Sequence, residues 1–202
     1  MANVLHINDV PSDFNPGPVL AVDTETTGLK LGRDRLCLVQ LSTGDGNATL
    51  VQIRRTPLPA PNLVRILTDP GVLKLFHFAR ADVAFLLSAF GVLTTPTYCT
   101  KIASKLARTN TSQHGLRALV EEIAGVALAK EQQCSDWGAD TLTLKQLEYA
   151  AADVLYLHEI RRALNKRLVR DERMALAEAC FRFVPDRASL DVAGWQFDIF
   201  SH

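Results

Sequence analysis

The stretch Val19-Leu-Ala-Val-Asp-Thr-Glu25 is an apolar run that turns acidic at its end. Such a run predicts a buried strand with two carboxylates where the strand leaves the core. Side chains alternate along a strand, so Asp23 and Glu25, two residues apart, lie on the same face. Two neighbouring carboxylates repel each other, and a bound divalent cation would offset that cost. The stretch therefore predicts a central strand and one half of a metal site.

A second acidic motif, Tyr149-Ala-Ala-Ala-Asp153, lies in a strongly helical stretch. Residues four apart share a helix face, so Tyr149 and Asp153 point the same way. A third motif, His77-Phe-Ala-Arg-Ala-Asp82, follows an expected strand at residues 72–76. It places Asp82 in the first turn of the next helix, where the helix dipole favours a carboxylate. Oxygen ligands alone select hard cations such as Mg²⁺ or Mn²⁺ rather than zinc.

Four carboxylates would then hold two divalent cations, Mg²⁺ or Mn²⁺, about 3.5–4 Å apart, the spacing of sites that cleave phosphodiesters. They are Asp23, Glu25, Asp82 and Asp153. The phenol of Tyr149 has an ordinary pKa of about 10, which makes it a poor general base. We therefore expect Tyr149 to orient the attacking water by hydrogen bonding.

The rest of the chain predicts an α/β fold with a mixed sheet flanked by helices. Further strand patterns lie at residues 4–7, Leu36–Ser42 and 49–53, with Gly44-Asp45-Gly46-Asn47 as a hairpin turn. Helical patterns lie at Pro61–Thr68, Ala79–Phe90, Thr100–Ala107, 114–124 and 143 to about 169. Thr143 and Gln146 form a capping box for the last helix, and Thr111 or Ser112 could cap the one before it. No repeat or linker divides the chain, so a single domain over residues 1–202 is expected.

Composition fits a globular protein, with 48% hydrophobic and 22% charged residues among 202. The 22 basic and 22 acidic residues balance, which argues against a tight, sequence-blind grip on long nucleic acid. The four scattered cysteines are expected to be reduced core thiols. There is no signal pattern and no apolar run long enough to cross a bilayer, so a cytoplasmic protein with no membrane partner is expected.

The end of the chain, residues 186–202, contains the unusually apolar and aromatic sequence LDVAGWQFDIF at positions 190–200. Chain ends usually fray, so such a sequence needs a partner surface. Either it packs on its own domain or it docks on a neighbouring subunit, and the sequence leaves both open.

These motifs in this order resemble the tyrosine-type DEDD 3′→5′ exonucleases, whose fold is ribonuclease H-like, also called DnaQ-like. Similarity to ribonuclease D extends over residues 23–29, 34–42, 76–82, 99–104, 133–137 and 149–158. The resemblance implies that ribonuclease D proper continues into accessory helical nucleic-acid-binding domains, and no such domain is expected in this chain. The ending at residues 190–200 is instead similar to nano-RNase C, a group of short bacterial exonucleases. That resemblance implies a ring-like homo-oligomer, with an octamer expected, that cuts dinucleotides to nucleoside 5′-monophosphates.

The resemblance also implies roles for particular side chains. The four carboxylates would be metal ligands, Tyr149 would position water, and Leu29 would wedge against the terminal bases. Further candidates for substrate binding are Thr26, His77, Lys101, Lys105, Arg108, His114, Gln133, Ser135, Asp136 and Trp137, with Arg117 in the same basic cluster. Structural alternatives stay open for several of these, because a basic cluster is often a solvated face and a tryptophan often packs in a core.

The expected activity is therefore metal-dependent 3′→5′ hydrolysis of short oligoribonucleotides. One alternative is a ribonuclease D-like enzyme that trims longer RNA or DNA 3′ ends. Another, from a different class, is a catalytically silent scaffold that binds nucleic acid on the same fold.

Overall fold

The computed structural model describes residues 3–54, 59–129, 135–195 and 197–201. Its centre is a six-stranded mixed sheet in the order β1-β4-β3-β2-β5-β6. The strands are β1 (Asn3–Ile7), β2 (Val19–Thr26), β3 (Leu36–Ser42), β4 (Ala48–Gln52), β5 (Leu73–Phe76) and β6 (Thr97–Cys99). The pairs β2–β3 and β3–β4 are antiparallel, whereas the other neighbouring pairs are parallel. Every residue of β3 is buried, as expected for a strand with neighbours on both sides.

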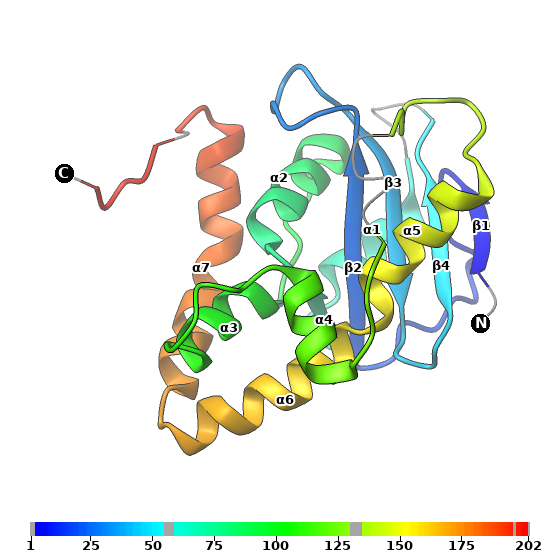
Figure 1. The fold of residues 1–202 in the computed structure, drawn as a ribbon. Coiled ribbons are helices and arrows are strands. Elements are labelled where there is room, and N and C mark those ends of the chain that lie inside the picture. Colours follow the sequence, from blue (N-terminus) through cyan, green and yellow to red (C-terminus); the bar gives the residue numbers. More distant parts are fainter. Residues whose placement is uncertain (1–2, 55–58, 130–134, 196, 202) are drawn as a thin grey trace.

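Seven helices are described: α1 (Pro61–Thr68), α2 (Ala79–Phe90), α3 (Thr100–Ala107), α4 (Leu116–Ala124), α5 (Leu144–Leu155), α6 (Leu157–Arg170) and α7 (Met174–Val192). Figure 1 shows α5 crossing in front of β2, β3 and β4, with α1 behind the sheet. The remaining helices gather beside the β2 side of the sheet (Figure 1). The helix α5 therefore brings its inward face directly over the end of β2.

The expected mixed α/β architecture is confirmed, and several boundaries follow local chemistry. The helix α2 ends at Gly91, whose φ of 70° is the left-handed conformation common after a helix. The capping box of Thr143 and Gln146 is present in both directions at the start of α5. The hairpin turn between β3 and β4 contains Gly44 and Gly46, each with a φ of 85°.

Two predictions of secondary structure were wrong, and two elements were missed. The single helix from 143 to about 169 is two helices, because the chain turns at Tyr156, after which His158 Nε2 contacts the Val19 carbonyl oxygen at 3.1 Å. The helix expected from residue 114 begins at Leu116, and neither proposed residue caps it: its N-cap is Gly115, with no side-chain hydrogen bond. The short β6 and the long α7 were not predicted at all.

The final segment separates into a helical and an extended part. The helix α7 includes residues 186–192, and beyond it the chain points away from the body (Figure 1). Trp195, Phe197 and Phe200 are 51%, 62% and 77% exposed. Of the two alternatives for this segment, packing on its own domain applies to the part in α7. The aromatic rings beyond α7 do not enter the core of the domain.

Two further observations bear on the environment of the chain. Cys37, Cys99 and Cys180 are free, but only the first two are buried, so the expectation of core thiols was wrong for Cys180. Among the described residues no helix is long and apolar enough to cross a membrane.

Candidate active site

Three carboxylates from two elements meet above the sheet. Asp23 and Glu25 lie on β2, and Asp153 lies on α5. One ligand oxygen of each lies within 4.8 Å of the others, close enough for all three to bind one ion. The alternation of a strand and the four-residue spacing of a helix therefore produce the juxtaposition that the sequence predicted.

Burial and mutual repulsion make these carboxylates unusually basic. Burial raises the pKa of Glu25 to about 8, with added repulsion from Asp153 and Asp82. Burial also raises the pKa of Asp153 to about 7, although Arg117 opposes the shift. The pKa of Asp23 lies well above its usual range, again chiefly because of burial. Carboxyls gathered in this way resist ionisation when no cation is bound, which is typical of a site for a positive ion.

Asp82 lies beside this group rather than within it. It is 7% exposed in the first turn of α2, and burial raises its pKa to about 7. The Thr24 hydroxyl donates a 2.7 Å hydrogen bond to Asp82 Oδ1, which fixes the carboxylate against β2. Repulsion between Asp82 and Asp23 contributes to the raised pKa of Asp23, so the two charges act on each other.

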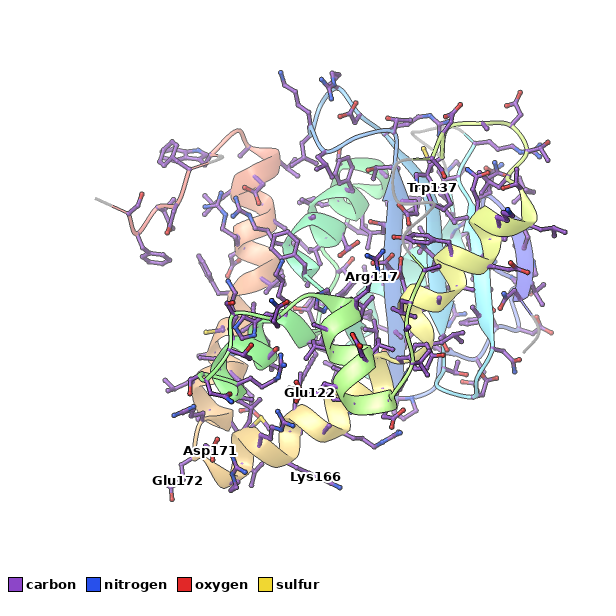
Figure 2. All side chains as sticks on the ribbon, viewed as in Figure 1. Arg117, Glu122, Trp137, Lys166, Asp171 and Glu172 are labelled. Carbon is purple, nitrogen blue, oxygen red and sulfur yellow. The ribbon has the colours of Figure 1, made fainter. Side chains whose placement is uncertain are left out.

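Two other side chains support the cluster, and the sequence analysis assigned neither to it. Gln40 of β3 pairs with Asp23 in the sheet register, is fully buried, and donates through Nε2 to Asp23 Oδ2 at 3.4 Å. Arg117 projects from α4 toward β2 and α5 (Figure 2) and donates a 2.9 Å hydrogen bond to the Ala129 carbonyl. Its positive charge favours the ionised form of Asp153. Only the strand register and the helix packing reveal these contacts.

Tyr149 lies on the same face of α5 as Asp153. Both side chains border a cavity of about 270 Å³. Burial, then the charges of Asp153 and Glu25, raise the pKa of Tyr149 above its usual value, so the phenol keeps its proton. The ring of Trp137 lies 6.2 Å from that of Tyr149, is 2% exposed, and supports it from the core side. Trp137 therefore packs in the core in this structure, and its expected contact with substrate stays a prediction.

His77 lies between β5 and α2, and its hydrogen bonds define its tautomer. The Thr100 hydroxyl donates to the Phe76 carbonyl at 3.1 Å, so its only hydrogen is used. In the 2.9 Å contact between His77 Nδ1 and Thr100 Oγ1, the histidine must therefore be the donor. Burial and the nearby Lys101 lower the pKa of His77 to about 4, which keeps the ring neutral at pH 7. Its Nε2 then offers a lone pair that can accept a hydrogen bond.

The loop after β2 carries Leu29, whose expected role as a wedge stays a prediction. Leu29 is 88% exposed, an unusual position for a leucine. Thr26 does not reach outward, because its hydroxyl donates to the Gly28 carbonyl at 2.6 Å and shapes the loop. Asp34 crowds Gly28 so closely that an added Cβ would lie 2.5 Å from its Oδ2. The loop is therefore tightly folded around a single protruding apolar side chain.

The remaining candidates divide into exposed and structural residues. Arg108 is 5% exposed and donates hydrogen bonds to Ser104, the Gln113 carbonyl and Glu122, so its guanidinium is engaged within the protein and its substrate role stays a prediction. His114 Nδ1 contacts Ser104 Oγ at 2.9 Å and is half-buried. Lys105 is exposed on α3, whereas the Nζ of Lys101 lies 4.1 Å from the centroid of the Phe78 ring.

The loop before α5 held three more candidates. Asp136 is exposed and accepts a 3.0 Å hydrogen bond from the Gly138 amide, and Ser135 is half-buried. Gln133 lies outside the described residues. A substrate role for these residues stays a prediction.

The donor set fits a hard divalent cation. Every side chain in the cluster offers carboxylate oxygen, and among the described residues no nitrogen or sulfur ligand joins it. Burial is the main cause of the raised pKa values of all three carboxyls, with mutual repulsion added for Asp23 and Glu25. Mg²⁺ and Mn²⁺ prefer such ligands. Asp23, Glu25 and Asp153 would hold the ion, with Asp82 available at the border of the cluster.

A family model described as 3'-5' exonuclease matches residues 6–169 of the chain. The chain belongs to the 3'-5' exonuclease family. Its structure is similar to that of NrnC from Brucella melitensis, with a TM-score of 0.96 and 51% identity over 99% of this chain and 98% of that one. The structure of Escherichia coli RNase D gives a TM-score of 0.75 and 32% identity over 85% of this chain and 45% of that one.

Ribonuclease D of Acidiphilium cryptum is 34% identical over 157 residues, which are 78% of this chain and 40% of that protein. The chain spans less than half the length of the curated relatives that it matches. These similarities confirm the expected ribonuclease H-like fold and the expected resemblance to ribonuclease D and nano-RNase C.

Proposed function

We propose that the chain is a metal-dependent 3′→5′ exoribonuclease that hydrolyses short oligoribonucleotides, dinucleotides above all, to nucleoside 5′-monophosphates. The carboxylate cluster beside Tyr149 is the observation that carries this proposal. Similarity to Brucella melitensis NrnC supports it, since that protein has been solved with bound Mg²⁺ and bound to pGG. An exonuclease family model supports the 3′→5′ direction.

Asp23, Glu25, Asp82 and Asp153 would together hold two divalent cations, Mg²⁺ or Mn²⁺. The cations would supply Lewis-acid activation of water and neutralise charge on the phosphate. Tyr149 keeps its proton, so its hydroxyl orients the attacking water through a hydrogen bond rather than removing a proton. Gln40 on β3 donates a hydrogen bond to Asp23, and the charge of Arg117 on α4 favours the ionised form of Asp153.

His77 gives the site a means to recognise the 3′ end of a strand. A neutral imidazole with a free Nε2 lone pair accepts from a hydroxyl and repels a phosphate oxygen. A terminal ribose hydroxyl is therefore its best partner. An exonuclease that starts at the 3′ end needs such a contact.

We further propose that the enzyme is a homo-oligomer, as an octameric ring, and that residues 186–202 lie at its subunit interface. The exposed rings of Trp195, Phe197 and Phe200 are the supporting observation, because large apolar groups exposed together on an extended segment favour a partner surface. Light scattering on the full chain and on a chain ending at Gly194 tests this. The full chain should give about eight times the monomer mass and the shortened chain less, whereas two identical monomer masses would exclude the assembly.

The test of activity is a time course with Mg²⁺ or Mn²⁺ on a 5′-labelled dinucleotide beside a 5′-labelled twenty-mer RNA. Fast cleavage of the dinucleotide and slow cleavage of the twenty-mer are expected, with no cleavage by the Asp153→Ala variant. Shortening of the twenty-mer while the dinucleotide remains would indicate a trimming enzyme, which the similarity to ribonuclease D favours as second candidate. Cleavage of neither would leave a silent nucleic-acid-binding scaffold.

A further inference from the structure

A second group of charged side chains lies outside the carboxylate cluster, where α7 packs against α2 (Figure 1). Asp191, in the last turn of α7, is 7% exposed. Nε and Nη2 of Arg80 donate to Oδ2 and Oδ1 of Asp191 at 2.6 and 2.7 Å, a bidentate ion pair between residues 111 positions apart. Such a pair fixes both the distance and the orientation of its partners. It therefore holds the last turn of α7 against the first turn of α2.

That first turn of α2 also carries an acid of the active site. Arg80 precedes Asp82 by two residues, and the Thr24 hydroxyl of β2 donates to Asp82 at 2.7 Å. The turn is thus held from β2 and from α7. Its N-cap residue, Phe78, makes no side-chain hydrogen bond to the helix. Because a helix end without a side-chain cap frays more easily, these two contacts bear on where Asp82 lies.

The carboxylate of Asp191 is also linked to the extended chain beyond α7. Arg187, one helical turn earlier on α7, donates to Asp191 Oδ1 at 2.6 Å. The same guanidinium donates to the Trp195 carbonyl and, at 3.3 Å, to the Phe197 carbonyl. Oδ1 of Asp191 therefore accepts from both Arg187 and Arg80. A movement of the two carbonyls that Arg187 binds would alter the ion pair that Arg80 makes.

From these contacts we propose that Asp191 is a positioning residue that links the tail, the chain beyond residue 194, to the active site. Through Arg80 it holds the turn that carries Asp82. Through Arg187 it makes that hold depend on the position of the tail. A surface that binds the exposed aromatic rings of the tail orders the carbonyls and strengthens the link, so tail docking and metal binding favour each other. The inference rests on the proposed function, which supplies the metal-dependent reaction and the docking of the tail.

The first test is amide hydrogen exchange in the metal-free protein, which needs neither a cation nor activity. Arg80→Gln removes the more exposed partner of the ion pair and leaves Asp191 paired with Arg187, so its Tm should stay close to that of the wild type. The amides of residues 83–86 bond to the carbonyls of the first turn of α2. Their exchange should be faster in Arg80→Gln, and also in a chain ending at Gly194, because both changes loosen that turn.

Metal affinity and kinetics give the second test. Arg80→Gln should weaken Mn²⁺ binding in calorimetry and lower kcat at subsaturating Mg²⁺ about 2- to 30-fold, the range for side chains that act on a site without touching its ligand. The KM for a dinucleotide should stay unchanged. In the chain ending at Gly194 the same substitution should cost less, because the link is already weakened. Arg170→Gln is the matched control, since Arg170 forms a similar bidentate pair with Asp171 after α6, and it should change neither exchange nor kinetics.

Three results would overturn the inference. One is exchange in Arg80→Gln equal to that of the wild type. Another is a raised KM with unaltered kcat and metal affinity, since that pattern describes a direct contact between Arg80 and the substrate. The third is an equal loss from Arg80→Gln in the full and the shortened chain, which would make the ion pair independent of the tail. Faster exchange in a protein that hydrolyses nothing would contradict the proposed function and leave the link standing, whereas hydrolysis with unchanged exchange would do the reverse.

Discussion

The metal-free protein should lose stability as the pH rises, and Asp153→Asn should remove much of that loss. The pKa of Asp153 is raised from 3.8 to about 7, mainly by burial. A carboxyl whose pKa is higher in the folded state binds its proton more tightly there than in the unfolded chain. Its contribution to stability is therefore fully present below about pH 4 and is lost as the pH rises through about 7. The same sign holds for Glu25, whose pKa is about 8, and for Asp82, at about 7.

The size of the effect follows from the shift. A change of about three pKa units corresponds to about 4 kcal/mol between the protonated and charged forms of one group. For a protein of this length, 1 kcal/mol moves the Tm by about 2–4 °C, so removing one charge should change the Tm by about 8–16 °C. The amide side chain of the variant cannot ionise, and the loss of the charge also reduces repulsion on the remaining carboxylates.

Thermal unfolding in EDTA between pH 4 and 8.5 measures this directly. The wild-type Tm should fall across the range, the two proteins should nearly coincide at pH 4, and the variant should be the more stable at pH 8. Adding Mg²⁺ at pH 8 should raise the Tm of the wild type only, because binding stabilises the state that holds the ligand. Asp13→Asn, at an exposed position, should keep the wild-type slope. A wild-type Tm that does not change with pH, or a variant less stable at pH 8, would refute the electrostatic argument.

Three further outcomes are expected. Tyr149→Phe should lower kcat by about two to four orders of magnitude with an unchanged fold, because it removes the water-orienting hydroxyl; unchanged single-turnover rates would leave the side chain a packing role. Gln40→Leu should weaken Mg²⁺ activation about 10- to 100-fold, as loss of an outer hydrogen bond to a metal ligand does, and an unaltered Mg²⁺ midpoint would exclude that support. Gly44→Ala should destabilise the fold more than Gly46→Ala, since both have a φ of 85° but only the first would place a Cβ 2.9 Å from the His158 ring; equal urea midpoints would show that the ring moves aside.

Much of the fold was predictable because local chemistry determines it. The bounds of α1, α2 and α3 match the predicted ranges. The turn at Tyr156 was not predictable from the sequence, because no glycine or proline marks it locally. A contact between His158 and the start of β2 accompanies the turn, and only the folded chain shows that contact. The helix α7 was missed because Pro185 lies inside it, a position where proline usually ends a helix.

The candidate site likewise contains some features that the sequence predicts and others that only the folded structure shows. Asp23, Glu25 and Asp153 could be predicted because two periodicities place them. The burial of Arg108 and Trp137 could not be predicted, since both residue types occur equally well on a surface that binds nucleic acid. The left-handed backbone conformation of Phe78, with a φ of 69°, could not be predicted either, because the sequence gives no reason for a bulky residue to take a positive φ. The cytoplasmic location stays a prediction.

The position of Gln40 explains how a repulsive cluster survives inside a folded chain. It lies on the fully buried β3, and its partner Asp23 is fixed by the antiparallel register between β2 and β3. A one-residue slip of that register would move Asp23 to the other face, together with every apolar side chain of β2. The hydrophobic core therefore determines the geometry of the carboxylates. Their mutual repulsion lowers the free energy of unfolding, which the packing of the sheet supplies. A bound cation removes this repulsion and so raises the free energy of unfolding again. Metal affinity and the fall of metal-free stability with pH therefore have the same physical origin.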